Sequence, residues 1–158
     1  MSDMTRRKFM KAAGASLAAS TVPFIMTNAR GASANETVNH AVVGVGGMGS
    51  GHAGNFARMK NCRLVAICDV DPKRLDKTAK SVSEHAKVKK YTDFRKLLED
   101  KDIDSISIAT CDHWHTPVAL AAIMAGKHVY VEKPSSHTVH EANLLMKAAK
   151  QNKKCVQH

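Results

Sequence analysis

HAVVGVGGMGSG, residues 40–51, joins a β-branched apolar run to a glycine-rich turn and then to a helical pattern. This order predicts a strand, a Gly-x-Gly-x-x-Gly turn at residues 44–49 and a helix, the setting of a dinucleotide-binding site. A second apolar run, residues 63–68, ends at Asp69, 20 residues after Gly49. An acid that binds ribose hydroxyls belongs at that distance. We therefore favour a dinucleotide-binding βαβ unit over a glycine-rich turn in an unrelated α/β protein.

Each glycine of this turn has a physical task. Gly44 lets the backbone turn tightly off the strand, and Gly46 lacks the Cβ that would keep a pyrophosphate away. Gly49 allows the helix to pack closely on the sheet. The free amides near Gly47 and Met48 then face the phosphates, where the helix dipole favours negative charge. These five residues are the predicted phosphate-binding group.

Strand and helix patterns alternate along the rest of the chain, and no internal repeat is visible. After Asp69, helices are expected at residues 72–86, 93–99, 116–125 and 138–152, and strands at 88–91, 105–109, 127–131 and 155–158. This predicts an α/β fold, a doubly wound parallel sheet with strand order 3-2-1-4-5-6, whose sixth strand is cut off as it begins. Ligands should bind beyond the carboxyl ends of strands 1 and 4.

The first 34 residues have the features of an export signal. TRRKFMK, residues 5–11, matches the twin-arginine pattern, and a mildly apolar segment at 12–26 is too short to span a membrane. Residues 32–34, Ala-Ser-Ala, supply a small-x-small cleavage site. We therefore expect a leader at 1–34, recognised by the twin-arginine export machinery, and a mature periplasmic domain at 35–158 without stable membrane insertion.

The formal net charge of +10 raises the question of nucleic acid. Two tyrosines, one tryptophan and four phenylalanines form no stacking platform among the basic residues, so a nucleic-acid partner is disfavoured. The four cysteines are too far apart in sequence for a paired zinc knuckle, and no metal site is expected. Export would permit a disulfide, but the sequence alone does not say whether any two cysteines meet.

Three further segments carry a resemblance to a known family. They are CDVDP at residues 68–72, TCDHWH at 110–115 and AGKHVYVEKP at 125–134. With the glycine turn, these segments make residues 38–158 resemble the N-terminal domain of the Gfo/Idh/MocA oxidoreductases. Glu-Lys-Pro after a buried strand is that family's signature. The resemblance implies oxidation or reduction of sugar and polyol hydroxyls with a nicotinamide cofactor.

By the same resemblance, Lys133 lies beside the reacting hydroxyl as the catalytic residue, while Glu132 and Pro134 shape the nicotinamide end. A lysine near a bound cation gives up its proton more easily, which suits acid–base work. Asp69 favours NAD, although Lys73 and Arg74 leave NADP open. The remaining predicted cofactor contacts follow strand 4 and are Thr110, Cys111, His113 and His115. At least one of these two histidines is expected to touch the cofactor or the substrate.

The sequence departs from the family pattern in two ways. Cys111 stands where proline is usual, and the family's second domain, which supplies substrate and oligomer contacts, would follow after His158. The chain is therefore expected to be the dinucleotide-binding portion of a homo-oligomeric sugar or polyol oxidoreductase. The alternative is a truncated NAD(P)-binding module that binds cofactor without turnover.

Overall fold

The computed structural model describes residues 37–158, so the predicted leader at residues 1–34 and its boundary lie outside the described part. A six-stranded parallel sheet has the order β3-β2-β1-β4-β5-β6, as the sequence predicts. The strands are β1 (Val38–Val43), β2 (Cys62–Cys68), β3 (Lys89–Tyr91), β4 (Ser105–Ile108), β5 (His128–Val131) and the short β6 (Val156–Gln157).

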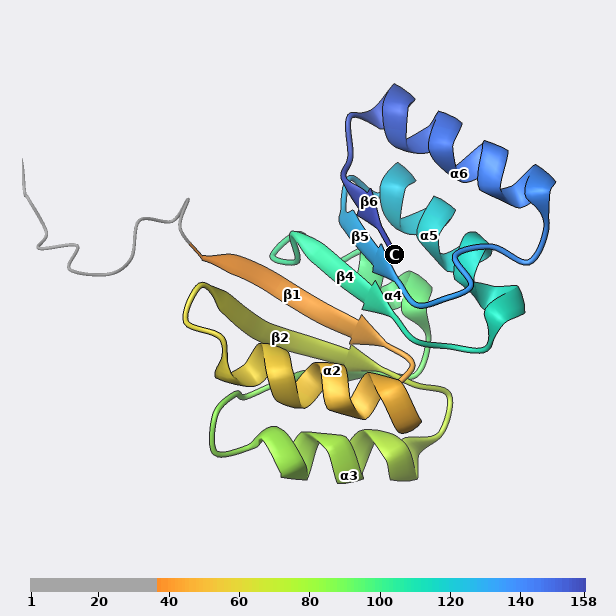
Figure 1. The fold of residues 1–158 in the computed structure, drawn as a ribbon. Coiled ribbons are helices and arrows are strands. Elements are labelled where there is room, and N and C mark those ends of the chain that lie inside the picture. Colours follow the sequence, from red (N-terminus) through yellow and green to blue (C-terminus); the bar gives the residue numbers. More distant parts are fainter. Residues whose placement is uncertain (1–36) are drawn as a thin grey trace, which may run out of the picture. The chain divides into compact units, whose positions relative to one another are not determined.

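Helices cover both faces of this sheet (Figure 1). They are α2 (Gly47–Arg58), α3 (Pro72–Val82), α4 (Phe94–Leu98), the 3₁₀ turn η1 (Asp112–Trp114), α5 (His115–Met124) and α6 (Val139–Asn152). Helices α2 and α3 pack on one face over β1 and β2, whereas α4 and α5 pack on the other, with α6 beside α5. The alternation of strands and helices therefore produces the doubly wound arrangement that the sequence predicts.

Each face of the sheet has its own hydrophobic core. Under α4, α5 and α6 the core is large and includes Ile106, Ile108 and Val131, none of which is exposed. Under α2 and α3 it is smaller and centres on Val42, Ile67 and Leu75. Strands buried on both faces are expected to be apolar, as the carboxyl-terminal parts of β1 and β2 are.

His40 is a polar exception at the seam between β1 and β4. Its ring is 4 % exposed, stacks on Phe56 of α2, and places its two nitrogens 2.7 and 2.8 Å from the hydroxyl oxygens of Ser105 and Ser107. Burial and the neighbouring His52 lower the pKa of His40 to about 4. The ring is therefore neutral at pH 7, with both nitrogens hydrogen-bonded, as a buried polar group requires.

The boundaries of two helices differ from expectation. Helix α3 ends at Val82 rather than near residue 86, because Ser83 turns its amide and its hydroxyl back to the Lys80 carbonyl. Helix α5 begins at His115, before Pro117, because η1 leads into it. Pro117 fits inside the first turn, where amide groups have no intrahelical partner. The strands after β3 are one or two residues shorter than expected.

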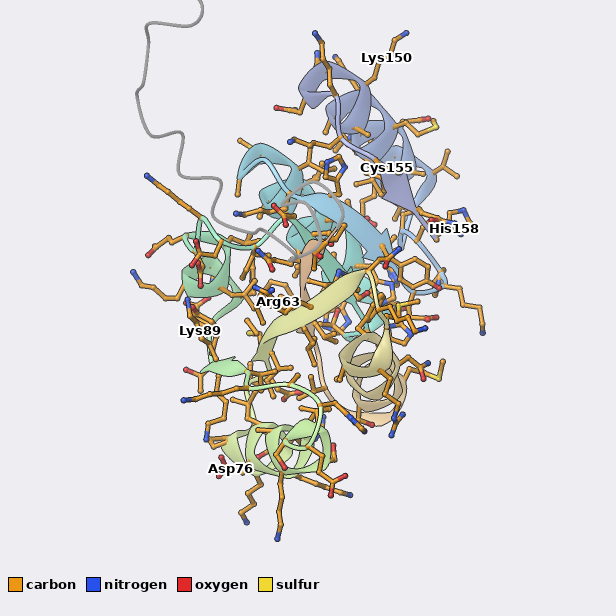
Figure 2. All side chains as sticks on the ribbon, turned by 90° about the vertical axis from the view of Figure 1, so that its left-hand side faces the viewer. Arg63, Asp76, Lys89, Lys150, Cys155 and His158 are labelled. Carbon is orange, nitrogen blue, oxygen red and sulfur yellow. The ribbon has the colours of Figure 1, made fainter. Side chains whose placement is uncertain are left out.

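Charged side chains extend from the periphery of the domain on separate elements. Figure 2 shows Asp76 on α3, Lys89 on β3 and Lys150 on α6 pointing away from the sheet. Lys89 pairs with Asp100 at 2.7 Å, and Lys90 pairs with Asp76 at the same distance. Among residues 37–158, no helix is both long enough and apolar enough to cross a bilayer.

Candidate functional site

The glycine turn connects β1 to α2 through two close backbone approaches. Gly44 has φ +83°, in the left-handed region, and a Cβ there would lie 2.7 Å from the Ala109 carbonyl oxygen. A Cβ on Gly49 would collide with the Gly44 carbonyl oxygen. Only glycine fits at either position without a movement of the backbone, because neighbouring backbone atoms occupy the space that a Cβ would need.

The amino end of α2 is open to a ligand. Its N-cap residue, Gly46, makes no side-chain capping bond, and its first turn holds no acidic residue. By contrast, side chains cap α3, α4 and α6 through Asp71, Asp93 and Thr138. The uncapped amides of α2 lie at the positive end of the helix dipole, where an anion is stabilised. This end of α2 is therefore suited to a phosphate.

Asp69 ties the glycine turn to the loop after β2. The residue is 7 % exposed; its Oδ2 accepts the amide of Val45 at 2.9 Å, and its Oδ1 accepts the amide of Asp71 at 3.0 Å. Each carboxylate oxygen can accept a second hydrogen bond. Asp69 can therefore hold the turn and still receive hydroxyl groups from a ligand.

A cavity of about 640 Å³ opens over this edge of the sheet. Eight of the residues predicted to bind cofactor line it: Gly44, Gly46, Gly47, Asp69, Arg74, Thr110, Cys111 and His113. The structure thus brings the segments after β1, β2 and β4 to one cavity. The other predicted residues do not line this cavity: Met48, Gly49, His115, Glu132, Lys133 and Pro134.

The far wall of the cavity follows β3 and was not among the predicted site segments. Phe94 and Arg95 line it together with Trp114 of η1. The rings of Phe94 and Trp114 meet edge to face at 6.2 Å, and the Arg95 guanidinium lies 4.8 Å from the Phe94 ring centre. Trp114 is 43 % exposed, so it does not simply pack in the core. No motif marks Phe94, because the sheet topology alone brings it opposite Trp114.

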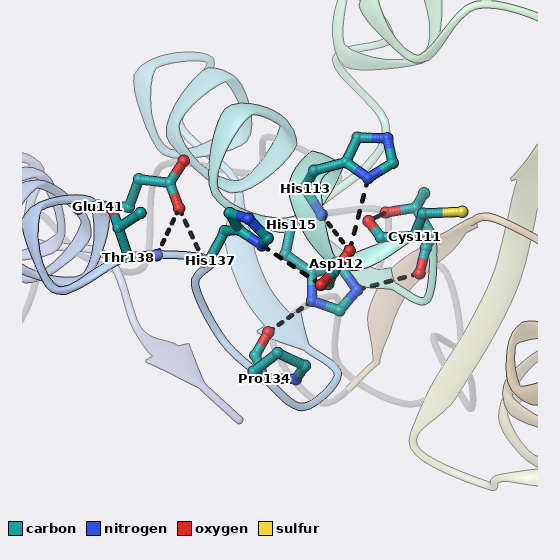
Figure 3. Close-up of polar contacts among 9 residues, drawn as sticks. Cys111, Asp112, His113, His115, Pro134, His137, Thr138 and Glu141 are labelled. Atoms are coloured by element: carbon teal, nitrogen blue, oxygen red, sulfur yellow. Dashed lines mark hydrogen bonds and ion pairs between the residues drawn. The ribbon is translucent and has the colours of Figure 1, made fainter.

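His115 lies beneath the loops that follow β4 and β5. The ring is buried, its Nδ1 is 2.7 Å from the Pro134 carbonyl oxygen, and its Nε2 is 3.1 Å from the Thr110 carbonyl oxygen (Figure 3). Both ring nitrogens are therefore directed at the protein's own backbone. This placement favours support of the two loops over the direct ligand contact that the sequence predicts.

Glu132 follows β5 and turns back toward α2. Its Oε1 lies 3.0 Å from Nε2 of His52, and its Oε2 accepts the amide of Lys133 at 3.3 Å. The Tyr130 hydroxyl is 3.5 Å from the same Oε1. His52 was not among the predicted site residues, since nothing in its local sequence points to a partner 80 residues away. The crossover of the chain creates this pair.

Asp112, in the loop after β4, lies between two exposed histidines, His113 and His137. Its carboxylate lies 3.5 Å from Nδ1 of His113 and 3.3 Å from Nδ1 of His137 (Figure 3). The His113 amide, with help from His137, holds the pKa of Asp112 below its usual value. Within residues 37–158, no group of three or more His, Cys, Asp or Glu side chains has a geometry that could hold a metal ion.

The cysteines do not form disulfides in the described part of the chain. Cys68 is buried at the end of β2, and burial raises the pKa of its thiol to about 12. A thiol with so high a pKa is a poor nucleophile at pH 7. Cys111 is exposed and lines the cavity, where the sequence predicts a cofactor contact.

Known proteins share this arrangement. Residues 38–158 match the oxidoreductase family described as having an NAD-binding Rossmann fold, the Gfo/Idh/MocA family. The chain is 36 % identical to a glycosyl hydrolase family 109 protein of Saccharopolyspora erythraea over 131 residues, 78 % of this chain and 28 % of that protein. It is 30 % identical to an alpha-N-acetylgalactosaminidase of Shewanella oneidensis in an alignment of 177 positions, which covers 98 % of this chain and 39 % of that protein.

A solved structure agrees with these sequence matches. Scyllo-inositol dehydrogenase from Lactobacillus casei, with bound NAD(H) and scyllo-inositol, superposes with a TM-score of 0.70 at 28 % identity, covering 77 % of this chain and 35 % of that one. The chain thus spans between about a quarter and two fifths of the length of these relatives.

Proposed function

This chain belongs to the Gfo/Idh/MocA oxidoreductase family, and we propose that it forms the cofactor-binding part of an enzyme that oxidises or reduces sugar or polyol hydroxyls. Residues 38–158 are the family's NAD-binding Rossmann domain, which confirms the fold and the nicotinamide cofactor predicted from the sequence. The observation that carries the proposal is the uncapped amino end of α2, which lies beside Asp69 at one cavity.

The residues present fit such a cofactor. The amides at Gly46, Gly47 and Met48 would receive the pyrophosphate, because Gly46 has no Cβ of its own to block it. Asp69 would receive the ribose hydroxyls and repel a 2′-phosphate, which favours NAD. Arg74 also lines the cavity, and its ion pair with Asp71 at 3.6 Å is exposed to solvent, so Arg74 leaves NADP as the alternative cofactor. Thr110, Cys111 and His113, which line the other side of the cavity, would hold the nicotinamide.

When bound, the cofactor supplies the hydride chemistry, and the chain supplies orientation and proton handling. Lys133 is exposed at the end of β5, from which its amine can reach a substrate hydroxyl. There it would hold or release the proton of that hydroxyl as the carbonyl forms. The inositol in the related Lactobacillus casei dehydrogenase supports a polyol as the substrate class.

Calorimetric titration of residues 35–158 with NAD and with NADP tests the cofactor assignment. We expect NAD to bind at least about tenfold more tightly than NADP, because the Asp69 carboxylate repels a second phosphate. Asp69→Ala should weaken NAD binding, and Asp76→Ala on the exposed face of α3 is the matched control. Equal affinities in the wild type, or an unchanged affinity in Asp69→Ala, would contradict the role of Asp69.

A second candidate function is glycoside hydrolysis that uses the cofactor by transient oxidation. The relatives of Saccharopolyspora erythraea and Shewanella oneidensis, which are named as a glycosyl hydrolase and a galactosaminidase, favour it. The longer protein should be offered an aryl α-N-acetylgalactosaminide and a panel of free polyols. Release of the aryl group without net NADH supports the glycosidase, whereas NADH formation from a polyol supports the dehydrogenase.

We also propose export through the twin-arginine pathway, on the basis of Arg6 and Arg7. Replacement of both arginines by lysine should leave the protein in the cytoplasmic fraction, whereas the wild type should be found in the periplasm. The wild type remaining in the cytoplasm would remove this proposal and leave the cofactor assignment untouched.

A further inference from the structure

Lys133 is exposed, but the residues on either side of it are held by two histidines, of which His115 is buried and His52 is 14 % exposed. Its predecessor Glu132 pairs with His52, and its successor Pro134 is bonded by His115. The two histidines come from different helices, α2 and α5. They therefore reach the same three-residue segment from the two halves of the domain.

The bond from His115 fixes the Pro134 end of the segment. The 2.7 Å contact with the Pro134 oxygen is shorter than the 3.1 Å contact with the Thr110 oxygen, so Nδ1 is the better placed donor. The ring is 2 % exposed and thus has no room to turn to solvent. This bond ties the Pro134 carbonyl to a ring that cannot move, and it therefore restricts where Pro134 can lie.

The bond from His52 fixes the Glu132 end of the segment. A carboxylate accepts hydrogen bonds and donates none, so the hydrogen lies on Nε2 of His52. Nδ1 is then buried with no hydrogen-bond partner among residues 37–158. An orphaned polar atom is unfavourable, and a leucine or phenylalanine would pack against Phe56 and Tyr130 without it. Packing alone therefore does not account for a histidine here.

We propose that His52 and His115 are positioning residues for Lys133, which hold Glu132 and Pro134 so that the lysine amine is presented at the nicotinamide end of the site. This proposal rests on the proposed function of the domain. His52 anchors the segment to α2, whose uncapped amino end would hold the pyrophosphate. His115 anchors it to the loop after β4, which lines the cavity through Thr110. The lysine is thereby fixed relative to both ends of the cofactor, and such fixation decides reactivity.

Paired variants separate a hydrogen-bonding role from packing. His52→Phe keeps a ring but removes the donor, whereas His52→Gln places an amide nitrogen near the position of Nε2. At the other anchor, His115→Leu removes the donor, whereas His115→Asn places an amide nitrogen near the position of Nδ1. Glu132→Gln probes the same bond from its acceptor, and the exposed His85→Ala is the matched histidine control.

Amide hydrogen exchange of Lys133 and NADH affinity are the two measurements, because the Lys133 amide donates to Glu132. We expect His52→Phe, His115→Leu and Glu132→Gln to exchange that amide about tenfold faster and to weaken NADH binding several-fold. His52→Gln, His115→Asn and His85→Ala should stay within about twofold of the wild type.

Wild-type exchange at Lys133 in His52→Phe and Glu132→Gln would overturn the proposal, and these two variants decide it even if His115→Leu fails to fold. Equal damage from His52→Phe and His52→Gln would also overturn it, since only packing would then matter. A wild type that binds no NADH would refute the proposed function, while the exchange rates would still decide whether the two histidines hold Lys133.

Discussion

The two halves of the ligand-binding edge are built in different ways. At the ends of β1 and β2, the site consists of backbone amides, missing side chains and one carboxylate, all within residues 44–71. At the ends of β4 and β5, it consists of side-chain hydrogen bonds among residues far apart in the sequence, such as His52 with Glu132 and His115 with Pro134. The first half should therefore tolerate no added atoms at Gly44 and Gly49, whereas the second should tolerate changes that keep its donors.

The largest expected effect comes from adding one methyl group to the first half. Gly44→Ala would place a Cβ against Ala109 at a positive φ, so the free energy of unfolding should fall by about 2–5 kcal/mol. Gly51→Ala, inside α2 and with no atom within 4 Å of the added Cβ, should instead raise it by about 0.5–1 kcal/mol. Urea unfolding measures both. Equal effects from the two substitutions would show that the close approach at Gly44 is not real.

The seam between the halves should make stability depend on pH. His40 has its pKa lowered to about 4, whereas the unfolded imidazole titrates near 6.5, so the unfolded chain binds more protons between these values. Stability is therefore complete above pH 6.5 and falls as the pH drops toward 4, by of the order of 3 kcal/mol from this residue. Urea unfolding at several pH values measures the slope. His40→Gln should be less stable at pH 7, but its free energy of unfolding should depend less on pH. An equally steep dependence on pH in this variant would assign the slope to other groups.

A smaller effect is expected from a side-chain cap in the second half. Thr138 accepts the amide of Glu141, whose carboxylate bonds the Thr138 amide in return. Thr138→Ala should lower the free energy of unfolding by about 1 kcal/mol. His140→Ala, in the same exposed first turn of α6, is the control. If both variants melt like the wild type, side-chain bonds in this half are weaker than we infer.

The smallest effect is expected away from the edge. Lys90 and Asp76 pair at 2.7 Å with both side chains largely exposed. Because solvent screens such pairs, Lys90→Met should change the free energy of unfolding by less than about 0.5 kcal/mol. A larger loss in urea unfolding would mean that stability is not concentrated at the two halves of the site.

The same contrast decides how much could be predicted from the sequence. The glycine spacing, the position of Asp69 and the alternation of strands and helices are local patterns, and they predicted the strand order and the cavity-lining turn. His52 and Phe94 acquire their partners through the crossover of the chain, so no local pattern marks them. Trp114 lies in a segment that the sequence singles out, but its contact with Phe94 was not predicted. His115 was singled out, but its burial against two carbonyl oxygens depends on where the β5 loop lies, which sequence spacing does not fix.

We infer that both halves of this edge hold one dinucleotide. Titration of ¹⁵N-labelled residues 35–158 with NADH, followed amide by amide, tests this inference. We predict that the amides of residues 46–49 and of residues 110–113 shift together with a single dissociation constant. Shifts confined to the first group, or centred on another part of the sheet, would contradict the claim.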